Sequence, residues 1–207
     1  MKPALALRTG AAVLCIGAAV VLVLLALDAR AWSSRLPADD LRYRRVPSAH
    51  GLWQPRELSP FGLDRTVLGI RDDIAYRRAL REFRMGRPLE PVFATNVTTH
   101  RVLAQIALTN VVQTSHDPAR ASQAANLLGV LGFAMATQDV GQRDTFLNNA
   151  ITAFRQAIAL DPTNDDALFN LEYALDQLKG SGEQQASGSD RPGQRGNAGL
   201  RPTGHGY

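Results

Sequence analysis

The chain has 207 residues, enough for one domain with tails, and 45% of them are hydrophobic. It carries 23 Lys and Arg and 19 Asp and Glu, a formal net charge of +4, and arginine supplies nearly all of the positive charge. The single cysteine, Cys15, excludes an internal disulfide bond and a cysteine-based metal cluster. Frequent Ala, Arg and Gly with only two lysines indicate a GC-rich bacterial genome.

The first predicted element is the apolar segment GAAVLCIGAAVVLVLLAL at residues 10–27. Its 18 uncharged residues would form a helix about 27 Å long, close to the thickness of the hydrocarbon core of a bilayer. We expect an uncleaved transmembrane anchor that contacts lipid and makes the chain a single-pass protein of the cell membrane. The alternative is a signal peptide cleaved after Ala29-Arg30-Ala31, but the apolar run is long for a secretory segment and its charged flank is a poor cleavage region.

The side of the membrane on which the rest of the chain lies stays open. Lys2 and Arg8 precede the apolar segment and five arginines follow it within residues 28–45, so the positive-inside rule favours a cytoplasmic body. A short basic N-terminus that resembles a signal sequence favours the opposite orientation.

Residues 31–71 are expected to form an irregular strap, because prolines interrupt this segment every few residues. Trp32 directly follows the apolar segment, at a position where an indole ring is favoured at a membrane interface. Other large apolar side chains of the strap are predicted to dock on the helical body, namely Trp53, Phe61 and Leu63.

The sequence DDIAYRRALREFR at residues 72–84 predicts an amphipathic helix that ends before Gly86 and Pro88. We interpret the side opposite its apolar stripe as facing water or lipid headgroups. That side carries Arg77, Arg78, Arg81 and Arg84. Nucleic-acid binding is an alternative interpretation of the basic face, but it has no interleaved aromatic residues and no recognised motif, so no nucleic-acid partner is expected.

Four further helices are predicted from apolar residues that recur at the helical period, at residues 99–113, 118–136, 144–160 and 164–178. Asp117 and Pro118 form an N-cap followed by a proline at the first helical position. Asn164 is predicted to cap the last helix. We expect two antiparallel pairs, the first two helices and the last two, stacked as a short α-solenoid.

The order of small and bulky residues in this region resembles a tetratricopeptide repeat. The residues that fit its consensus are Leu128, Leu131, Gly132, Met135, Ala150, Phe154, Ala157 and Pro162. The resemblance covers about residues 118–178 and implies one repeat followed by a terminal helix. Because 18 positions separate Gly132 from Ala150, more than the repeat usually has, an enlarged loop near residues 137–144 is expected to hold the excess.

The ending DDALFNLEYAL also resembles the closing helix of tetratricopeptide proteins encoded beside MoxR-type ATPases and von Willebrand factor A-domain membrane proteins. A membrane anchor, a strap rich in Pro and Trp and a short repeat are similar to the actinobacterial members of such clusters. This resemblance implies an accessory part in a membrane complex that assembles or matures other proteins.

The fold class is therefore predicted as all-α, with an N-terminal transmembrane helix, a short tetratricopeptide-like α-solenoid and a disordered C-terminal tail. The tail is rich in Gly, Ser, Gln, Pro and Arg and cannot bury enough surface to fold. We divide the chain into a cytoplasmic stub with the anchor (1–30), the strap (31–71), the helical domain (72–179) and the tail (180–207).

A search for catalytic chemistry finds no P-loop, no nucleophile elbow, no H-E-x-x-H and no paired cysteines, and the four histidines are isolated in sequence. We therefore expect no enzyme activity, no cofactor and no metal. Two alternatives stay open: a tethered enzyme with a non-obvious site, and an anionic-lipid or nucleic-acid binder acting through residues 72–84.

The favoured interpretation is a membrane-anchored adaptor that binds a protein or peptide partner. The residues expected to contact this partner lie off the packing stripe of the last predicted helix, and they are Asp166, Phe169, Asn170 and Tyr173. In the repeat family, an asparagine where Asn170 stands often hydrogen-bonds the backbone of a ligand peptide. The alternative is that this helix only caps the solenoid, with its aromatic side chains covered by the strap or the tail.

Overall fold

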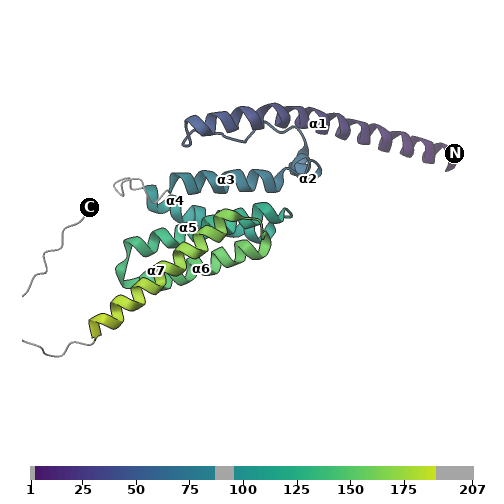
Figure 1. Ribbon diagram of the computed structural model, residues 1–207. Helices are drawn as coiled ribbons and strands as arrows, with labels where there is room; N and C mark the ends of the chain where they lie inside the picture. Colours follow the sequence, from purple (N-terminus) through teal and green to yellow (C-terminus); the bar gives the residue numbers. More distant parts are fainter. Residues whose placement is uncertain (1–2, 87–95, 190–207) are drawn as a thin grey trace, which may run out of the picture.

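The computed structural model describes residues 3–86 and 96–189, and the regular structure in these two ranges is helical, which confirms the all-α prediction at that level. In chain order the elements are α1 (Pro3–Arg45), η1 (Pro60–Gly62), α2 (Leu63–Val67), α3 (Arg71–Met85), α4 (Asn96–Thr114), α5 (Pro118–Gln138), η2 (Val140–Gln142), α6 (Arg143–Leu160) and α7 (Asp165–Ser189). Figure 1 shows α3 lying between α1 and the other helices, while the N-terminal half of α1 projects alone.

The helix α1 has two halves with different surroundings. Residues 10–27 are apolar and mostly exposed, and among the described residues α1 is the helix that is long and apolar enough to cross a membrane. The sequence predicts an irregular segment from residue 31, but the helix continues through Pro37 to Arg45. A proline inside a helix costs about 3 kcal/mol, and ion pairs of Asp39 with Arg35 and Arg42, at 3.0 and 3.1 Å, span the turns around it and help to offset that cost.

Because α1 extends to Arg45, the strap is shorter than predicted, and from here on the name refers to residues 46–62. This segment runs back along the second half of α1. The Trp53 amide donates to Asp39 Oδ2 at 2.8 Å, and further along the amides of Leu58 and Ser59 donate to Asp28, each at 2.8 Å. Both carboxylates are buried, at 0% exposure for Asp39 and 1% for Asp28. Backbone N–H groups that meet carboxylates therefore fix the path of the strap.

Two predictions for the aromatic residues of this region are corrected by the structure. Trp32 does not face a membrane interface, since it is 2% exposed and its Nε1 donates to Asp64 Oδ2 of α2 at 2.7 Å. Trp53 docks, but on α1 instead of the helical body, where its Nε1 donates to Asp40 at 2.8 Å. Leu63 is 40% exposed, and the side chain of Phe61 lies outside the described residues.

The helices α3 to α7 pack one after another into the helical body. The predicted pairs, 99–113 with 118–136 and 144–160 with 164–178, do pack together as α4 with α5 and α6 with α7, and α3 packs on α4, but α5 makes its most extensive contact with α6. The reason is the glycine content of α5. A Cβ on Gly129 would overlap the ring of Phe154, and a Cβ on Gly132 would lie 3.5 Å from the Ala150 Cβ. Only small residues at these places let α6 approach so closely.

Two boundaries also differ from expectation. The connection between α5 and α6 holds only residues 139–142, most of them in η2, so the extra positions between Gly132 and Ala150 lengthen both helices instead of enlarging a loop. The helix α7 continues to Ser189, past the predicted start of the tail at residue 180, and residues 190–207 of that tail lie outside the described residues.

Candidate partner-binding face and interhelical polar network

The four residues predicted to bind a partner all lie on one side of α7. Asp166, Phe169, Asn170 and Tyr173 follow the i, i+3, i+4, i+7 spacing that places side chains on one helix face. Phe169 is 69% exposed and Tyr173 is 50% exposed. Neither aromatic ring is covered by the strap, which lies along α1, so within the described residues the covered alternative is wrong as far as the strap is concerned.

Asn170 is not a free amide, because it contacts the neighbouring helix. Its Nδ2 donates to Asn126 Oδ1 of α5 at 2.9 Å. Three residues further along α7, the ring of Tyr173 lies 5.3 Å from the ring of Phe133. The surface is thus built from two helices, and we call it the α5–α7 face. Its members are Asn126, Phe133, Asp166, Phe169, Asn170 and Tyr173.

Sequence reasoning did not find Asn126 and Phe133. Asn126 is 7% exposed in a helix that is otherwise apolar around this point. A polar amide there needs a partner, and its spacing of seven residues from Phe133 puts both on one face of α5. That combination was the available signal, but identifying the partner as Asn170 required knowing that α7 lies beside α5.

A second buried hydrogen-bonded group holds α7 in place against α5. Ser122 Oγ donates to the Ala157 carbonyl at 2.7 Å, and Asn164 Nδ2 donates to Ser122 Oγ at 2.8 Å. Asn164 Oδ1 in turn accepts from the Ala167 amide at 3.1 Å, as the predicted N-cap should. The start of α7 is therefore tied to both α5 and the end of α6, and the α5–α7 face is presented by a fixed helix.

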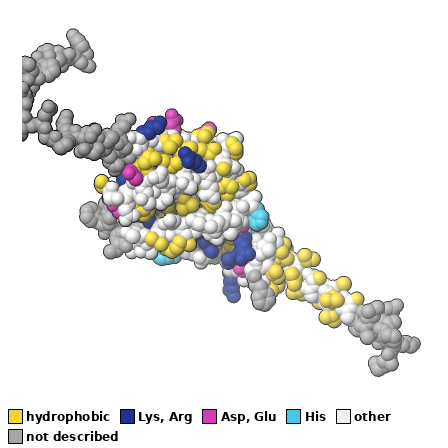
Figure 2. Space-filling model, turned by 90° about the horizontal axis from the view of Figure 1, so that it is seen from below, with side chains coloured by type: hydrophobic (Ala, Val, Ile, Leu, Met, Phe, Trp, Pro, Cys, Tyr) yellow, Lys and Arg dark blue, Asp and Glu magenta, His cyan; other side chains and the backbone are white. Residues whose placement is uncertain are grey.

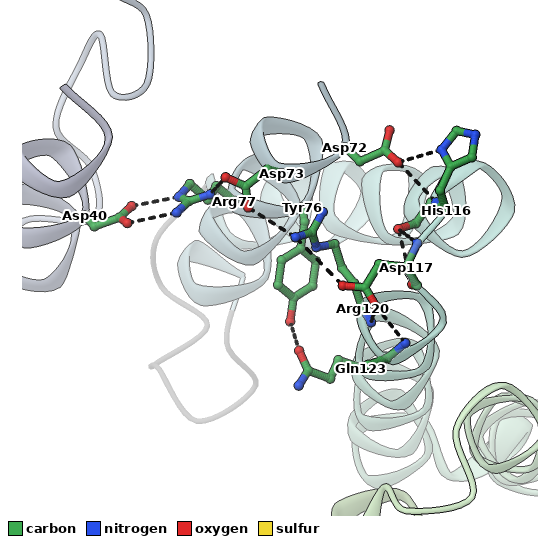
Figure 3. A network of polar contacts seen from close by, with 11 residues as sticks. Asp40, Asp72, Asp73, Tyr76, Arg77, His116, Asp117, Arg120 and Gln123 are labelled. Carbon is green, nitrogen blue, oxygen red and sulfur yellow. Dashed lines mark hydrogen bonds and ion pairs between the residues drawn. The ribbon is translucent and has the colours of Figure 1, made fainter. Parts of the chain in front are cut away.

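A polar network joins α1, α3 and α5 on the other side of the body (Figure 3). It consists of alternating acidic and basic side chains, in the order Asp40, Arg77, Asp73, Arg120 and Asp117. The Arg77 guanidinium reaches Asp40 with Nε at 2.9 Å and Nη2 at 3.1 Å, and Arg120 Nη2 lies 3.3 Å from Asp73. The network lines a cleft of about 430 Å³ between α1 and the body.

The hydrogen bonds of this network affect the titration of its members. Burial is the largest influence on Arg77 and acts to lower its pKa, but the hydrogen bonds to Asp40 and Asp73 outweigh it and raise the pKa above the ordinary value. Burial also raises the pKa of Tyr76, whose hydroxyl group donates to Gln123 at 2.7 Å. The cleft is therefore lined by acidic and basic side chains that pair with one another.

The arginines of α3 do not form the solvated basic side that the sequence predicts. Arg81 Nε donates to the Pro47 carbonyl of the strap at 2.9 Å, and Arg84 donates to the Tyr43 and Arg44 carbonyls of α1 at 3.4 and 3.3 Å. With Arg77 on Asp40, three of the four arginines predicted for the basic side bind α1 and the strap. Arg78 is exposed, and burial of part of its side chain lowers its pKa.

The histidines of the described ranges are separated in space as well as in sequence. His100 Nδ1 lies 2.6 Å from Glu82, and His116 Nδ1 lies 2.9 Å from Asp72, while His50 is exposed in the strap. Among the described residues no three His, Cys, Asp or Glu side chains gather where they would hold a metal ion.

Comparison with protein-family models, with curated proteins and with solved structures found no match to this chain.

Proposed function

We propose that this chain is a membrane-anchored protein–protein interaction adaptor whose α5–α7 face receives a protein or peptide partner. The observation that carries the proposal is the pair of exposed aromatic rings, Phe169 and Tyr173, beside the Asn126–Asn170 amide pair. Aromatic side chains exposed on a fixed helix give apolar contact at low entropic cost, and they are enriched among residues that dominate binding. The amides add donors and acceptors for a peptide backbone.

The packing of α5, α6 and α7 supports a tetratricopeptide-type arrangement of this adaptor. Gly132 meets Ala150, and Phe154, at 1% exposure, fills the space against Gly129, as expected when small and bulky residues alternate in a helical repeat. The resemblance of the closing helix extends the proposal to an accessory role in a membrane-associated complex that assembles or matures other proteins.

The anchoring part of the proposal rests on residues 10–27. Their side chains are mostly exposed, and their mean hydropathy is high enough for a membrane span. An exposed apolar rod about 27 Å long has no partner in the described protein, and a bilayer is the medium that matches its length. We infer a single-pass protein of the cell membrane, with lipid as the partner of this segment.

The observations favour neither of the two other functions. An arginine-based lipid or nucleic-acid site would need free guanidinium groups, whereas Arg77, Arg81 and Arg84 already bind acceptors within the chain. A metal-dependent enzyme would need a cluster of ligands, and the described residues do not form one.

The adaptor proposal is tested by crosslinking in native membranes. A photoreactive amino acid is placed at position 169 or 173 of the full-length chain, the membranes are illuminated, and the crosslinked species are extracted in mild detergent. We expect a discrete adduct from both positions. A probe at position 166 should give an adduct with the same partner, and Phe169→Ala plus Tyr173→Ala should abolish that adduct.

The matched control is Val102→Ala plus Ile106→Ala, which removes two other exposed apolar side chains, 52% and 62% exposed, from α4. This control should leave the adduct unchanged, and far-UV circular dichroism should show equal helix content in all variants. An adduct that survives the loss of both aromatic rings would contradict the assignment of this face.

A further inference from the structure

Besides Val46, which directly follows α1 and is 51% exposed, three large apolar side chains stay exposed in the segment that joins α1 to α3. They are Leu58 at 49%, Leu63 at 40% and Val67 at 64% exposure. The middle of the strap buries its large apolar residues well, with Leu52 at 4% and Trp53 at 1% exposure. Apart from Val46, the exposure is therefore confined to the end of the strap nearest α2 and to α2 itself, and the buried middle of the strap shows that the segment as a whole is not poorly packed.

Hydrogen bonds hold α2 and the end of the strap that precedes it beside α1, at the point where the apolar residues 10–27 end. The Leu58 amide donates to Asp28 Oδ1 at 2.8 Å, and Asp28 is the first residue after the apolar segment. Asp64 of α2, the neighbour of Leu63, accepts from Trp32 Nε1 at 2.7 Å. Trp32 lies about 6 Å beyond Asp28 along the helix, at 1.5 Å per residue. In Figure 1, α2 accordingly lies beside α1 where its projecting half begins.

The patch thus lies at the level along α1 where the apolar projecting half ends. Figure 2 shows hydrophobic side chains along the projecting half up to its junction with the body. Leu63 and Val67 are four residues apart in α2 and share one side of it. Asp28, which ends the apolar segment, and Asp64 of α2 are 1% and 0% exposed, so that both carboxylates near the patch are screened from their surroundings.

We propose that the patch formed by Leu58, Leu63 and Val67 enters the interfacial layer of the same bilayer that α1 crosses. The inference rests on the membrane anchoring proposed above and adds a second, shallow contact with lipid. The polar layer on each side of the hydrocarbon core is about 5–8 Å deep, which spans the level from Asp28 to Trp32. An apolar helix face at that level inserts into the boundary between headgroups and acyl chains.

This arrangement also explains why the strap turns back to Asp28. A bare carboxylate at the edge of the hydrocarbon core is unfavourable. The amides of Leu58 and Ser59 and the Ser59 hydroxyl group bind this one while the apolar side chain of Leu58 faces outward. The strap therefore satisfies the charge and presents an apolar surface to the lipid at the same level.

The test uses the full-length chain in vesicles of phosphatidylcholine and phosphatidylglycerol. Cys15, which is exposed in the apolar half, is replaced by Ser, and single cysteines at positions 58, 63 and 67 are labelled with a polarity-sensitive nitrobenzoxadiazole probe. Lipids that carry a nitroxide near the headgroup should reduce the emission about twofold or more at all three positions, and more than lipids with a deep nitroxide.

Two reference positions make the result decisive. A probe at Val20, 54% exposed in the apolar half, should be quenched best by the deep nitroxide, and a probe at Val140, 83% exposed in η2, should not be quenched. If position 20 is quenched and positions 58, 63 and 67 behave like position 140, the shallow contact is overturned and the anchor stands. If position 20 is not quenched, the anchor itself fails.

A second variant guards against a label that perturbs the fold. In Leu63→Asp plus Val67→Asp, with the probe at position 58, shallow quenching should fall toward the level of position 140 while the helix content measured by circular dichroism stays the same. Unchanged quenching in this variant would contradict a contact made by the patch.

Discussion

The contact between α1 and the strap and the contact between α5 and α6 are stabilised by different kinds of interaction. In the first, buried carboxylates of Asp28 and Asp39 bind backbone N–H groups. In the second, glycine and alanine let two helices approach until Phe154 fills the space against Gly129. Small-residue packing depends on shape and leaves no room for a Cβ at Gly129, whereas the carboxylates define the register of one segment against another through directional bonds.

The strap also contains strain that its hydrogen bonds have to offset. Trp53 has a φ of +54°, in the left-handed region that a residue with a side chain seldom adopts. Its amide and its indole nitrogen donate to Asp39 and Asp40, and its ring lies 5.4 Å from that of Tyr43. The α5–α6 contact needs no such compensation, because regular helices supply all of its groups. We therefore expect that a substitution that disrupts one of the two contacts leaves the other intact.

The largest expected effect is on the α5–α6 contact. Phe154→Ala removes a ring that is 1% exposed and should lower the free energy of unfolding by about 3–5 kcal/mol. The matched control is Phe169→Ala, since the same residue type at 69% exposure should change it by no more than about 0.5 kcal/mol. Urea unfolding of the detergent-solubilised chain, followed by circular dichroism, measures both. Equal losses for the two variants would contradict the packing described for α5 and α6.

A smaller and local effect is expected in the strap. Asp28→Ala leaves the Leu58 and Ser59 amides without their acceptor, and the buried Ser59 amide should account for most of a cost of about 1–3 kcal/mol, because the part-buried Leu58 amide can bind water instead. Hydrogen exchange followed by mass spectrometry should show faster exchange around residues 58 and 59 and unchanged protection in α5 and α6. The control is Asp166→Ala, an exposed acid on α7, which should leave the strap as it is. Faster exchange across the whole body would show that the two contacts are not independent.

The same difference explains what could be predicted from the sequence. Apolar periodicity and caps locate α3, α5 and α6 to within a few residues, because packing repeats every turn and Asp117 and Pro118 mark a helix start by local chemistry. The pattern also found the exposed side of α7, including Phe169.

The features that the sequence did not reveal depend on partners distant in the chain. No structural role was assigned to Asp28, Asp39 or Asp64 from the sequence, because nothing local marks the amides or the indole that bind them. Pro37 suggested an irregular segment, because helix propensity includes the free-energy cost of a proline inside a helix. It does not include the ion pairs around Pro37 that help to offset this cost. Asn126 could be recognised as a polar group needing a partner, but Asn170 is 44 residues away.

The smallest expected effect concerns a carboxylate at the surface, where Asp72 at the start of α3 binds the turn between α4 and α5. The hydrogen bonds from the His116 side chain and backbone, in that order, hold the pKa of Asp72 below its ordinary value of 3.8. A depressed pKa means that the folded state favours the ionised form. The stabilisation is therefore fully present above pH 3.8 and is lost as the pH falls through the lower folded value.

A carbon-detected NMR titration of the detergent-solubilised chain measures this pKa directly. His116→Ala should raise the pKa of Asp72 toward 3.8 but not to it, because the backbone amide of residue 116 still donates at 3.1 Å. Thr163→Ala is the matched control for a surface acid elsewhere, since it should raise the pKa of Asp161, which the Thr163 hydroxyl group and amide lower, and leave that of Asp72 unchanged. If Asp72 titrates at the same pH with and without the imidazole, the ring contributes nothing to this link. Water would then screen the interaction between the Asp72 carboxylate and the His116 ring, and the contact between α3 and the α4–α5 turn would depend on the backbone hydrogen bond alone. The contact between α1 and the strap differs, because its carboxylates are buried.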